Sequence, residues 1–492
     1  MKVPVSLKRW LQERRLTRVL LAVHLLMMLA AILRAPVRST DETTYMALAR
    51  SLEHGHFSVW DGVFEPPPAD VIRTHGYPAF LAAVRLIGHD VRWVYLVQGV
   101  LHLTVLLLLL RLLKGDDDAS HLRSNALLLL LLPQLQLLHY AAQVFPETLV
   151  SLLLLLVALA AMRGQDAGRW WRLSLAAALL FWVRPVMLLL PLALLLFDLV
   201  VSRRGERWML LRANTLALGF FVALGPLPFA CWNQAVHGYF KPVPLTGSAV
   251  ISNLGIWQAR LPGYGTMHYF QNNFFGHELV PWVTPDEAER HYARYQLQWQ
   301  RIDSITRPSM TAGDSLLLPQ MVQDSIYYTR SARYTVALNE AIAAENRSMI
   351  REEPLYYMAT RAYAAVRLWI TNVNFPMKRI VYQPGTGMRP EVGRPEGLKG
   401  WLGVLVPTVI TGLSFGVGLP LLCAAIWRNR SRWYERRYLL LVILYVWAVH
   451  IPMTIQSRYT VPVHAIALAC MAWAIGDRLM RGRHHGEAAA RV

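Results

Sequence analysis

The sequence predicts an all-helical protein that crosses a membrane many times. Hydrophobic residues make up 54% of the 492 residues, charged residues make up only 16%, and long apolar runs recur along the chain. A water-soluble globule of this length carries more charge, because its surface must face water. We therefore expect about ten transmembrane helices, each close to the length that a bilayer requires.

The apolar runs form two groups, which a long polar stretch separates. The runs 172–184 and 186–201 are shorter than a typical span. The basic start of the chain also fits a cleaved signal, but the many later runs favour an uncleaved first helix. The predicted spans are residues 16–34, 91–112, 124–141, 147–162, 172–184, 186–201, 213–232, 400–427, 438–455 and 460–480.

Basic residues gather in the short loops between these runs. With about ten spans, every basic cluster falls on one side, which the positive-inside rule assigns to the cytoplasm. We therefore expect a multi-pass membrane protein with both termini in the cytoplasm. The Leu- and Arg-rich composition is typical of a GC-rich bacterial genome, so we expect the membrane to be a bacterial inner (plasma) membrane. Despite the net charge of +19, we expect no nucleic-acid partner. The clusters lie at the N-terminus, at 111–123, 163–172, 203–212 and 428–437, and in the tail from residue 478.

Two polar segments remain on the opposite face, and we expect the chemistry there because they are too polar to cross a membrane. Stretches 331–344 and 354–370 mix aromatic and Arg residues, as helices at a membrane interface do. The predicted modules are an N-terminal transmembrane module (1–232) with the first external loop (35–90), an extracytoplasmic segment (233–399), and C-terminal helices with a cytoplasmic tail (400–492).

Asp41 and Glu42 follow the first span, where the chain reaches water on the outer face. A carboxylate at this level can act as a general base. Neighbouring side chains diverge, so at most one of the two is expected to point into a shared pocket. Alternatively, both only stabilise the start of a helix expected at 43–53, because carboxylates are favoured at helix N-termini.

Arg184 and Arg458 stand at outer helix ends that carry no other basic residue. Charge at the membrane edge is costly and is a functional hypothesis by default, and a guanidinium matches the oxygens of a phosphate. Either residue could therefore bind a lipid phosphate. The alternative is a structural pair with an acidic residue such as Glu147, which could also simply cap the helix that begins there.

A divalent-cation site in the first external loop is a further alternative. His54 and His56 lie close in sequence to Asp41, Glu42 and His75, and imidazole and carboxylate groups are common metal ligands. This scattered set has no defining spacing, so we predict no metal ligand and no certain cofactor. The three cysteines lie far apart and predict no disulfide framework.

Several short motifs, in order along nearly the whole chain, resemble those of GT-C glycosyltransferases. These enzymes are related to protein O-mannosyltransferases and to the bacterial transferase that adds aminoarabinose to lipid A. Each motif alone is weak, but ordered motifs in the expected topology are more specific than one pattern. The matching residues are Asp41-Glu42 with Tyr45 and the helix 46–52, Gly76-Tyr77-Pro78 before a short apolar helix (79–87), Pro146-Glu147, Arg184-Pro185, Trp232-Asn233 within 228–238, and Arg458-Tyr459-Thr460-Val461-Pro462.

The resemblance implies that a sugar passes from a polyprenyl-phosphate carrier, such as undecaprenyl phosphate, to an extracytoplasmic glycan, lipid or protein by inverting displacement. Asp41 would activate the acceptor hydroxyl, with Glu42 as the other catalytic candidate. The implied ligands of the donor phosphate are Arg458, Arg184 and Tyr459, and the implied substrate contacts are Tyr45, Arg73, His75, Tyr77, Glu147 and Asn233.

Three positions depart from the family pattern. His75 stands where many relatives have Pro, Gln234 follows Asn233 where an Arg-Asn pair is usual, and Gln456 replaces a frequent acidic residue. These three departures concern the preference of the enzyme for its acceptor more than its fold. A transporter or flippase for a lipid-linked sugar is the alternative function, although such proteins place polar residues and broken helices at mid-membrane. A non-catalytic scaffold would leave Asp41 dispensable.

Overall fold

The chain folds into a bundle of helices. The computed structural model describes residues 10–33, 40–61, 67–114, 119–163, 168–245, 300, 302–310, 331–352, 354–369, 409–452 and 457–489. Within these ranges the protein forms helices and no strand, as the composition predicts.

The helices of the N-terminal half are α2 (Arg14–Leu33), α3 (Thr40–Glu53), α4 (Gly76–Arg85), α5 (Val91–Leu113), α6 (Ala119–Leu131), α7 (Leu135–Ala141), α8 (Glu147–Met162), α9 (Arg169–Val183), η1 (Pro185–Leu189), α10 (Leu190–Val201), α11 (Arg204–Leu224) and α12 (Pro226–His237). Those that follow are η2 (Arg307–Ser309), α18 (Ala332–Glu352), α19 (Pro354–Arg367), η3 (Gly412–Val417), α22 (Gly418–Arg428), α23 (Arg430–Tyr434), α24 (Arg437–His450), η4 (Ser457–Tyr459) and α25 (Val461–Ala489).

Five helices in the described part of the chain are long and apolar enough to cross a membrane, and three shorter apolar helices coincide with further predicted spans. The long helices are Arg14–Leu33, Val91–Leu113, Arg204–His237, Val409–Arg428 and Val461–Met480, and the shorter ones are Glu147–Met162, Pro185–Val201 and Arg437–His450. The start of the predicted span 400–427 and the end of 438–455 lie outside the described residues.

The prediction of one helix over 124–141 is wrong, because α6 ends at Leu131 and α7 begins at Leu135. Pro133 lies in the break, since proline lacks the backbone N–H and its ring clashes with the preceding helical turn. The last helix, α25, is instead longer than the predicted span 460–480. It continues to Ala489, through residues that the sequence assigns to a tail.

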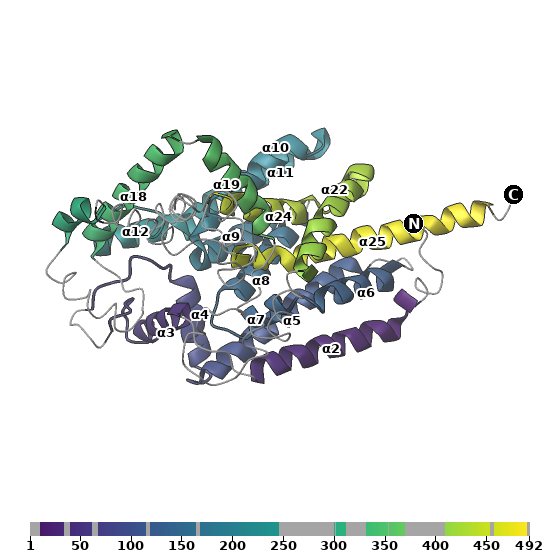
Figure 1. Cartoon of the computed structure of the whole chain (residues 1–492), viewed down its shortest axis with the longest axis horizontal. Coiled ribbons are helices and arrows are strands. Elements are labelled where there is room, and N and C mark those ends of the chain that lie inside the picture. Colours follow the sequence, from purple (N-terminus) through teal and green to yellow (C-terminus); the bar gives the residue numbers. More distant parts are fainter. Residues whose placement is uncertain are drawn as a thin grey trace, which may run out of the picture.

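The most buried of the candidate spans is the last one. Within the candidate span of α25, 67% of the residues are buried, against 17% in α2. α25 therefore lies inside the bundle and α2 lies at its edge, where Figure 1 also shows it. The side chains of Val463, Ile466 and Leu468 are fully buried, whereas Leu26 of α2 is 66% exposed. Exposed apolar side chains on a peripheral helix are expected where lipid, not water, is the solvent.

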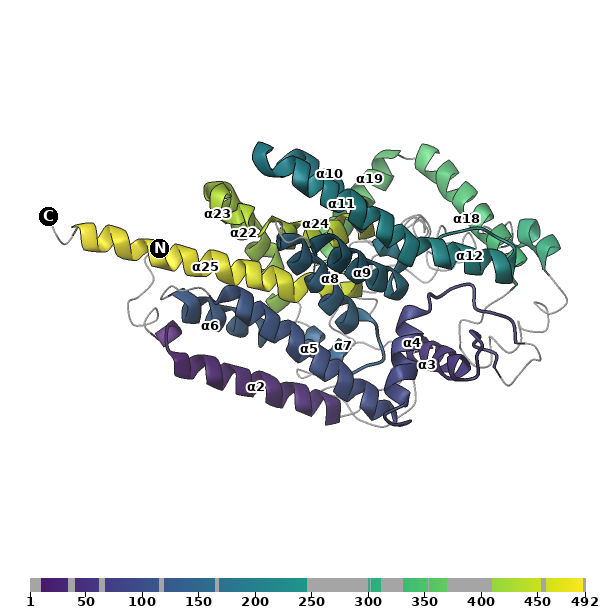
Figure 2. The same ribbon diagram turned by 180° about the vertical axis from the view of Figure 1, so that it is seen from behind.

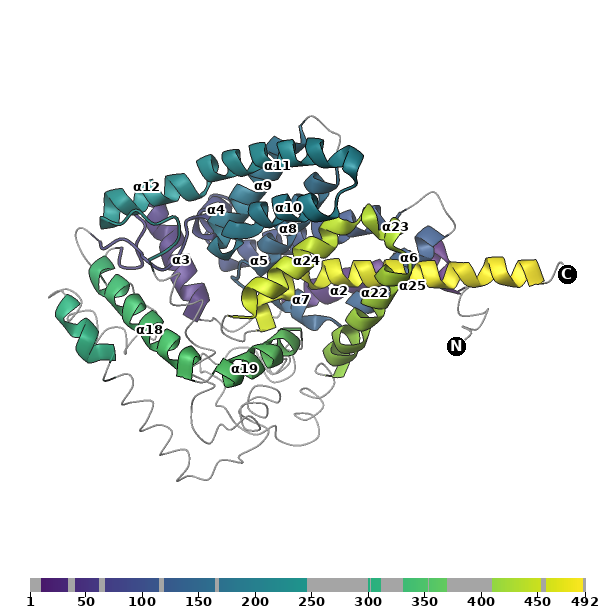
Figure 3. The same ribbon diagram turned by 90° about the horizontal axis from the view of Figure 1, so that it is seen from above.

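The long helices α2, α5, α11 and α25 run roughly along the long axis, and the two ends of the bundle differ. α3, α4, α12 and α18 lie at one end, whereas α6, α22 and the C-terminal part of α25 lie toward the other (Figure 2). The view from above separates the same elements (Figure 3). The helices α3, α4 and α18 of the two polar segments therefore share one end, away from the end of α5, the start of α6 and the short helix α23, which carry basic residues.

Exposed tryptophans accompany the basic clusters. Trp208 at the start of α11 is 79% exposed, Trp427 at the end of α22 is 73% exposed, and Trp171 at the start of α9 is 49% exposed. The guanidinium of Arg430 lies 4.0 Å from the ring centroid of Trp427. Tryptophan favours the membrane–water interface, so these side chains agree with a membrane boundary at the basic end.

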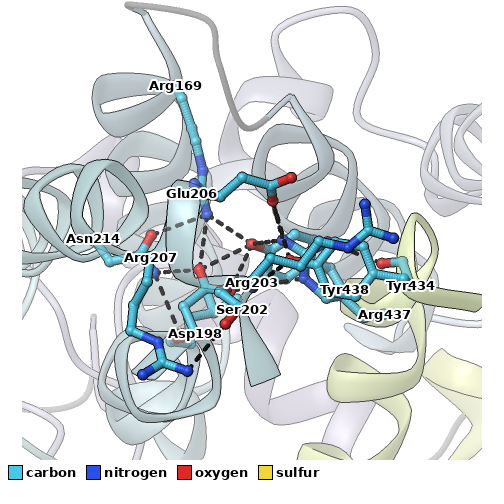
Figure 4. Close-up of polar contacts among 11 residues, drawn as sticks. Arg169, Asp198, Ser202, Arg203, Glu206, Arg207, Asn214, Tyr434, Arg437 and Tyr438 are labelled. Carbon is cyan, nitrogen blue, oxygen red and sulfur yellow. Dashed lines mark hydrogen bonds and ion pairs between the residues drawn. The ribbon is translucent and has the colours of Figure 1, made fainter. Parts of the chain in front are cut away.

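A buried polar network joins α9, α10 and α11 to α24 (Figure 4). Arg169 donates from Nη2 to Asp198 Oδ2 at 3.2 Å and to Asn214 Oδ1 at 3.1 Å, and the Tyr438 hydroxyl donates to Asp198 Oδ1 at 2.7 Å. Arg169 is 1% exposed and Asp198 is fully buried. Charges this deep are stable only with partners, so the network fixes a C-terminal helix against the N-terminal ones.

The membrane sidedness is testable by cysteine labelling in a background without Cys231, Cys423 and Cys470. We expect His56→Cys and Ser304→Cys to react with an impermeant maleimide on intact cells, because the positive-inside rule places both loops outside. Gly205→Cys is the matched control at the basic end, where a new side chain meets nothing within 4 Å. It should react only after permeabilisation. Labelling of Gly205→Cys on intact cells would reverse the predicted topology.

Candidate functional site

The centre of the candidate site is a carboxylate held between two guanidiniums. Arg73 donates from Nη2 to Asp41 Oδ1 at 2.7 Å, and Arg458 donates from Nη1 to Asp41 Oδ2 at 2.7 Å. Asp41 belongs to the first turn of α3, Arg73 precedes α4, and Arg458 lies in η4, 417 residues away from Asp41 in sequence. The contact joins the segment between α2 and α5 to the start of the last span.

Local structure fixes Arg73 in this position. The buried Asp70 accepts hydrogen bonds at Oδ1 from the backbone N–H groups of Ile72 (2.6 Å) and Arg73 (2.9 Å), which forms a tight turn. Three residues later, Gly76 starts α4 directly against α9. A Cβ on Gly76 would lie 2.4 Å from the carbonyl carbon of Trp182, so only glycine permits this approach.

The charges around Asp41 decide its ionisation. Burial alone would raise the pKa of Asp41, but the positive charges of Arg458 and Arg73, with a smaller effect of Arg184, lower this pKa below its usual range. The carboxylate is therefore ionised at neutral pH. Its ion pairs contribute stability above the pKa of the unfolded chain, and this contribution is lost as the pH falls through the lower pKa of the folded state.

A second ion pair lies beside the first. Arg184, between α9 and η1, donates from Nη2 to Glu147 Oε1 at the start of α8. Glu147 is 1% exposed, and its Oε2 has no hydrogen-bond partner among the described residues. Tyr459 connects the two pairs, because the guanidiniums of Arg184 and Arg458 lie 5.4 and 5.8 Å from its ring centroid. Tyr459 also stacks on His450 at 4.8 Å between ring centroids.

Tyrosines surround the first pair on the side of α5. The Arg73 guanidinium lies 5.1 Å from the ring centroid of Tyr45, which meets Tyr77 edge to face at 4.9 Å. The Tyr77 hydroxyl donates to Gln98 Oε1 at 3.2 Å, and Gln98 donates to the backbone oxygen of Gln143. A chain of polar contacts therefore runs from the site into α5 and the segment before α8.

Glu42 lies away from the arginines, although it is adjacent to Asp41. Its side chain is buried, 3% exposed, and its Oε1 accepts a hydrogen bond from the hydroxyl of Tyr95 on α5 at 3.4 Å. The side chains of Asp41 and Glu42 diverge on helix α3, as expected from the sequence. Of the two carboxylates, Asp41 is the one that forms ion pairs with Arg73 and Arg458 in the described structure.

His75 lies in an aromatic cluster and makes no ion pair in the described structure. Its ring stacks on Phe57 at 3.8 Å and meets Trp232 edge to face at 4.4 Å between centroids. Burial, with a smaller effect of His237, lowers the pKa of His75 to about 4, so the ring is neutral at neutral pH. A neutral imidazole in this cluster brings no positive charge to a phosphate.

Asn233 has a structural contact. Its Nδ2 donates to the backbone oxygens of Lys241 at 2.7 Å and Val243 at 3.0 Å, which holds the turn after α12. The chain beyond this turn reaches the segment between α3 and α4, where Leu245 N–H donates to Val71 O at 3.0 Å. Asn233 therefore helps to position the loop that carries Arg73.

The structure brings together most of the residues singled out in the sequence. Asp41, Arg73, Tyr45, Tyr77, Glu147, Arg184, Arg458 and Tyr459 form one connected set of ion pairs and ring contacts. Glu42, His75 and Asn233 make their contacts elsewhere. Gln456 lies outside the described residues. Sequence reasoning missed Tyr95 and Gln98, although a glutamine inside an apolar span is itself a signal of function or buried pairing.

His54 and His56 do not join Asp41 and Glu42 in a metal-binding group within the described residues. His54 pairs with Asp61 through Nδ1 at 2.6 Å, and His56 is exposed. No group of three or more His, Cys, Asp or Glu side chains is arranged for metal binding in the described ranges. The three cysteines are free.

Comparison with known proteins gives a distant structural similarity. The chain matches no protein-family model and no curated protein. It is similar to the cryo-EM structure of the arabinosyltransferase EmbB from Mycobacterium smegmatis, at 16% identity and a TM-score of 0.31. The alignment covers 96% of this chain and 42% of that chain, so this chain spans less than half the length of that structure. We therefore base the function on the geometry of the site.

A double-mutant cycle tests the second ion pair. We expect Glu147→Ala to lower stability by roughly 3 kcal/mol or more, because it leaves a largely buried guanidinium without its carboxylate. Glu147→Ala with Arg184→Ala should cost less than the sum of the single changes. Thermal unfolding of the purified protein in detergent gives the comparison. Asp303→Ala, which breaks an exposed pair with Arg307, is the control and should change little. Additive losses would show that the pair contributes no stability.

Proposed function

We propose that this protein is a membrane glycosyltransferase that transfers a sugar from a polyprenyl-phosphate donor to an acceptor hydroxyl on the extracytoplasmic face. The observation that carries the proposal is the Arg73–Asp41–Arg458 cluster where the membrane helices end. It combines an ionised carboxylate with guanidiniums at the level where a lipid-anchored phosphate would lie.

The charges of the cluster suit this donor. One carboxylate between two guanidiniums leaves one positive charge in excess, and the neighbouring Arg184–Glu147 pair is neutral as a unit. The headgroup of a polyprenyl-phosphate sugar is a phosphodiester with one negative charge. Guanidiniums present paired donors that match phosphate oxygens, so Arg458 can hold the phosphate.

The reaction needs a base on one side of the anomeric carbon and a stabilised phosphate on the other. Asp41 accepts the proton of the acceptor hydroxyl, whose oxygen attacks the anomeric carbon. The bond from that carbon to the phosphate oxygen breaks, and the leaving polyprenyl phosphate gains a second negative charge. Arg458 stabilises this charge, and Arg184 is the alternative for the same role. Glu42, buried against Tyr95, is the second candidate for the base.

The described contacts favour an enzyme over a transporter or flippase for a lipid-linked sugar. Transporters collect polar residues at helix breaks in mid-membrane. The cluster here lies between an external loop and the start of the last span, on elements tied to one another by ion pairs.

Replacement of the base tests the chemistry. Asp41→Asn keeps the shape of the side chain but removes the basic oxygen, so transfer should fall by roughly 100- to 10,000-fold. The assay is transfer by purified protein from a panel of polyprenyl-phosphate sugars. Glu42→Gln is the matched comparison at the adjacent position and should have the smaller effect. The base would have to be reassigned to Glu42 if the two results were reversed.

Replacement of Arg458 tests the phosphate contact. We expect Arg458→Ala to reduce transfer by roughly 10- to 100-fold, because one charge-assisted hydrogen bond to phosphate is lost. Arg458→Lys should not restore it, since an ammonium is a point charge without the planar fork of donors. The kinetics of Arg184→Ala give the comparison. Normal turnover by Arg458→Ala would contradict the assignment and leave Arg184 as the candidate.

A further inference from the structure

Both oxygens of the proposed base are occupied by guanidiniums. Oδ1 accepts from Arg73 and Oδ2 accepts from Arg458, each at 2.7 Å. Asp41 is partly buried, with a side chain 19% exposed, so water screens these contacts only in part. A carboxylate with both oxygens in charge-assisted bonds is a weak base, because the positive charges stabilise its ionised form.

The same guanidinium has two anionic partners in the proposed reaction. Arg458 pairs with Asp41 in the structure, and the proposed function assigns the donor phosphate to it. A phosphate that takes over the charge-assisted bonds of Arg458 removes them from Asp41. Its negative charge also disfavours the ionised form of a nearby carboxylate.

We propose that the donor phosphate displaces Arg458 from Asp41, so that Asp41 becomes an effective base only after the donor has bound. This inference rests on the proposed function and adds an order of events to it. Arg73 keeps its bond to Oδ1 and holds the carboxylate in place, while Oδ2 becomes available to the acceptor hydroxyl. A site without donor therefore holds its base in an inactive pair.

The two arginines differ in how firmly they are fixed. Arg73 follows a turn closed by two hydrogen bonds to Asp70, and its neighbour Gly76 packs against the backbone of α9. Arg458 lies in the three-residue helix η4, and its guanidinium is 5.5 Å from the ring centroid of Phe145. A short 3₁₀ segment has poorer hydrogen-bond geometry than an α-helix, so the backbone at Arg458 is held less firmly than the closed turn at Arg73.

The other charged and titratable groups around Asp41 set the background for any change in its protonation. Arg184 is positive, Glu147 is paired with it, and burial raises the pKa of Tyr45, so the Tyr45 hydroxyl is neutral at neutral pH. None of these groups changes charge when Arg458 exchanges partners. The groups that interact electrostatically with Asp41 are Arg458, Arg73, Arg184, Tyr45 and Tyr140, and Glu147 interacts with Arg458.

Binding without turnover tests the exchange. The probe is a polyprenyl methyl phosphodiester, which keeps one negative charge at every pH used and has no sugar to transfer. We expect Asp41→Asn to bind this probe roughly ten-fold more tightly than the wild type, because the carboxylate that competes for Arg458 is gone. The corresponding polyprenol, which has no phosphate, controls for binding of the lipid chain alone. Its affinity should be the same for the wild type and for Asp41→Asn.

A matched variant controls for net charge. Glu53→Gln removes one negative charge from the same helix, α3, where Glu53 pairs with Arg85 instead. Its affinity for the probe should equal that of the wild type, because screening weakens distant surface charges. Equal or weaker binding by a folded Asp41→Asn, relative to the wild type, would overturn the exchange.

A measurement on the unmodified protein covers the case in which Asp41→Asn does not fold. If the phosphate takes Arg458, the pKa of Asp41 rises on binding, so the protein takes up protons. Probe affinity should therefore increase as the pH falls through the pKa that Asp41 has in the bound state, with proton uptake measurable by calorimetry in buffers of different ionisation heat. A pH-independent affinity would contradict the exchange. Failure of the wild type to bind the probe would instead contradict the proposed function.

Discussion

A charge inside an apolar bundle is stable only when a partner compensates it, and this constraint organises the protein at both ends. At one end, Asp41 joins the segment between α2 and α5 to the start of the last span through Arg458. At the other, Asp198 binds Arg169 in the interior, and Arg123 of α6 pairs with Asp477 of α25 at 2.8 Å. Hydrophobic burial drives helix association weakly in lipid, so such pairs and close packing determine which helices meet.

The carboxylates at the two ends are compensated in different surroundings. Around Asp198, arginine, tyrosine and asparagine side chains supply hydrogen bonds from three directions in a site that water does not reach, which favours one fixed arrangement. Around Asp41, the partners are themselves partly exposed, with 25% exposure of Arg73 and 26% of Arg458. An ion pair that is only partly desolvated can be exchanged for a new anion at lower cost than a fully buried one.

Most helices could be predicted from the sequence because each is set by its own residues. An apolar run of sufficient length forms a helix wherever it lies, since lipid leaves no other way to pair the backbone groups. The breaks are local as well, as Pro133 shows between α6 and α7. α18 and α19 follow the amphipathic pattern seen in the sequence, because helical periodicity also depends only on neighbouring residues.

The sequence by itself determined the helical class, the order of the helices and the residue types available at the helix ends. Only the tertiary structure decided which of them meet: Asp41 rather than Glu42 contacts the arginines, and Arg184 takes Glu147, the structural pair that the sequence left open. The physical reason is that an ion pair depends on distance in space. Asp41 and Arg458 are separated by 417 residues, and no local spacing encodes their contact.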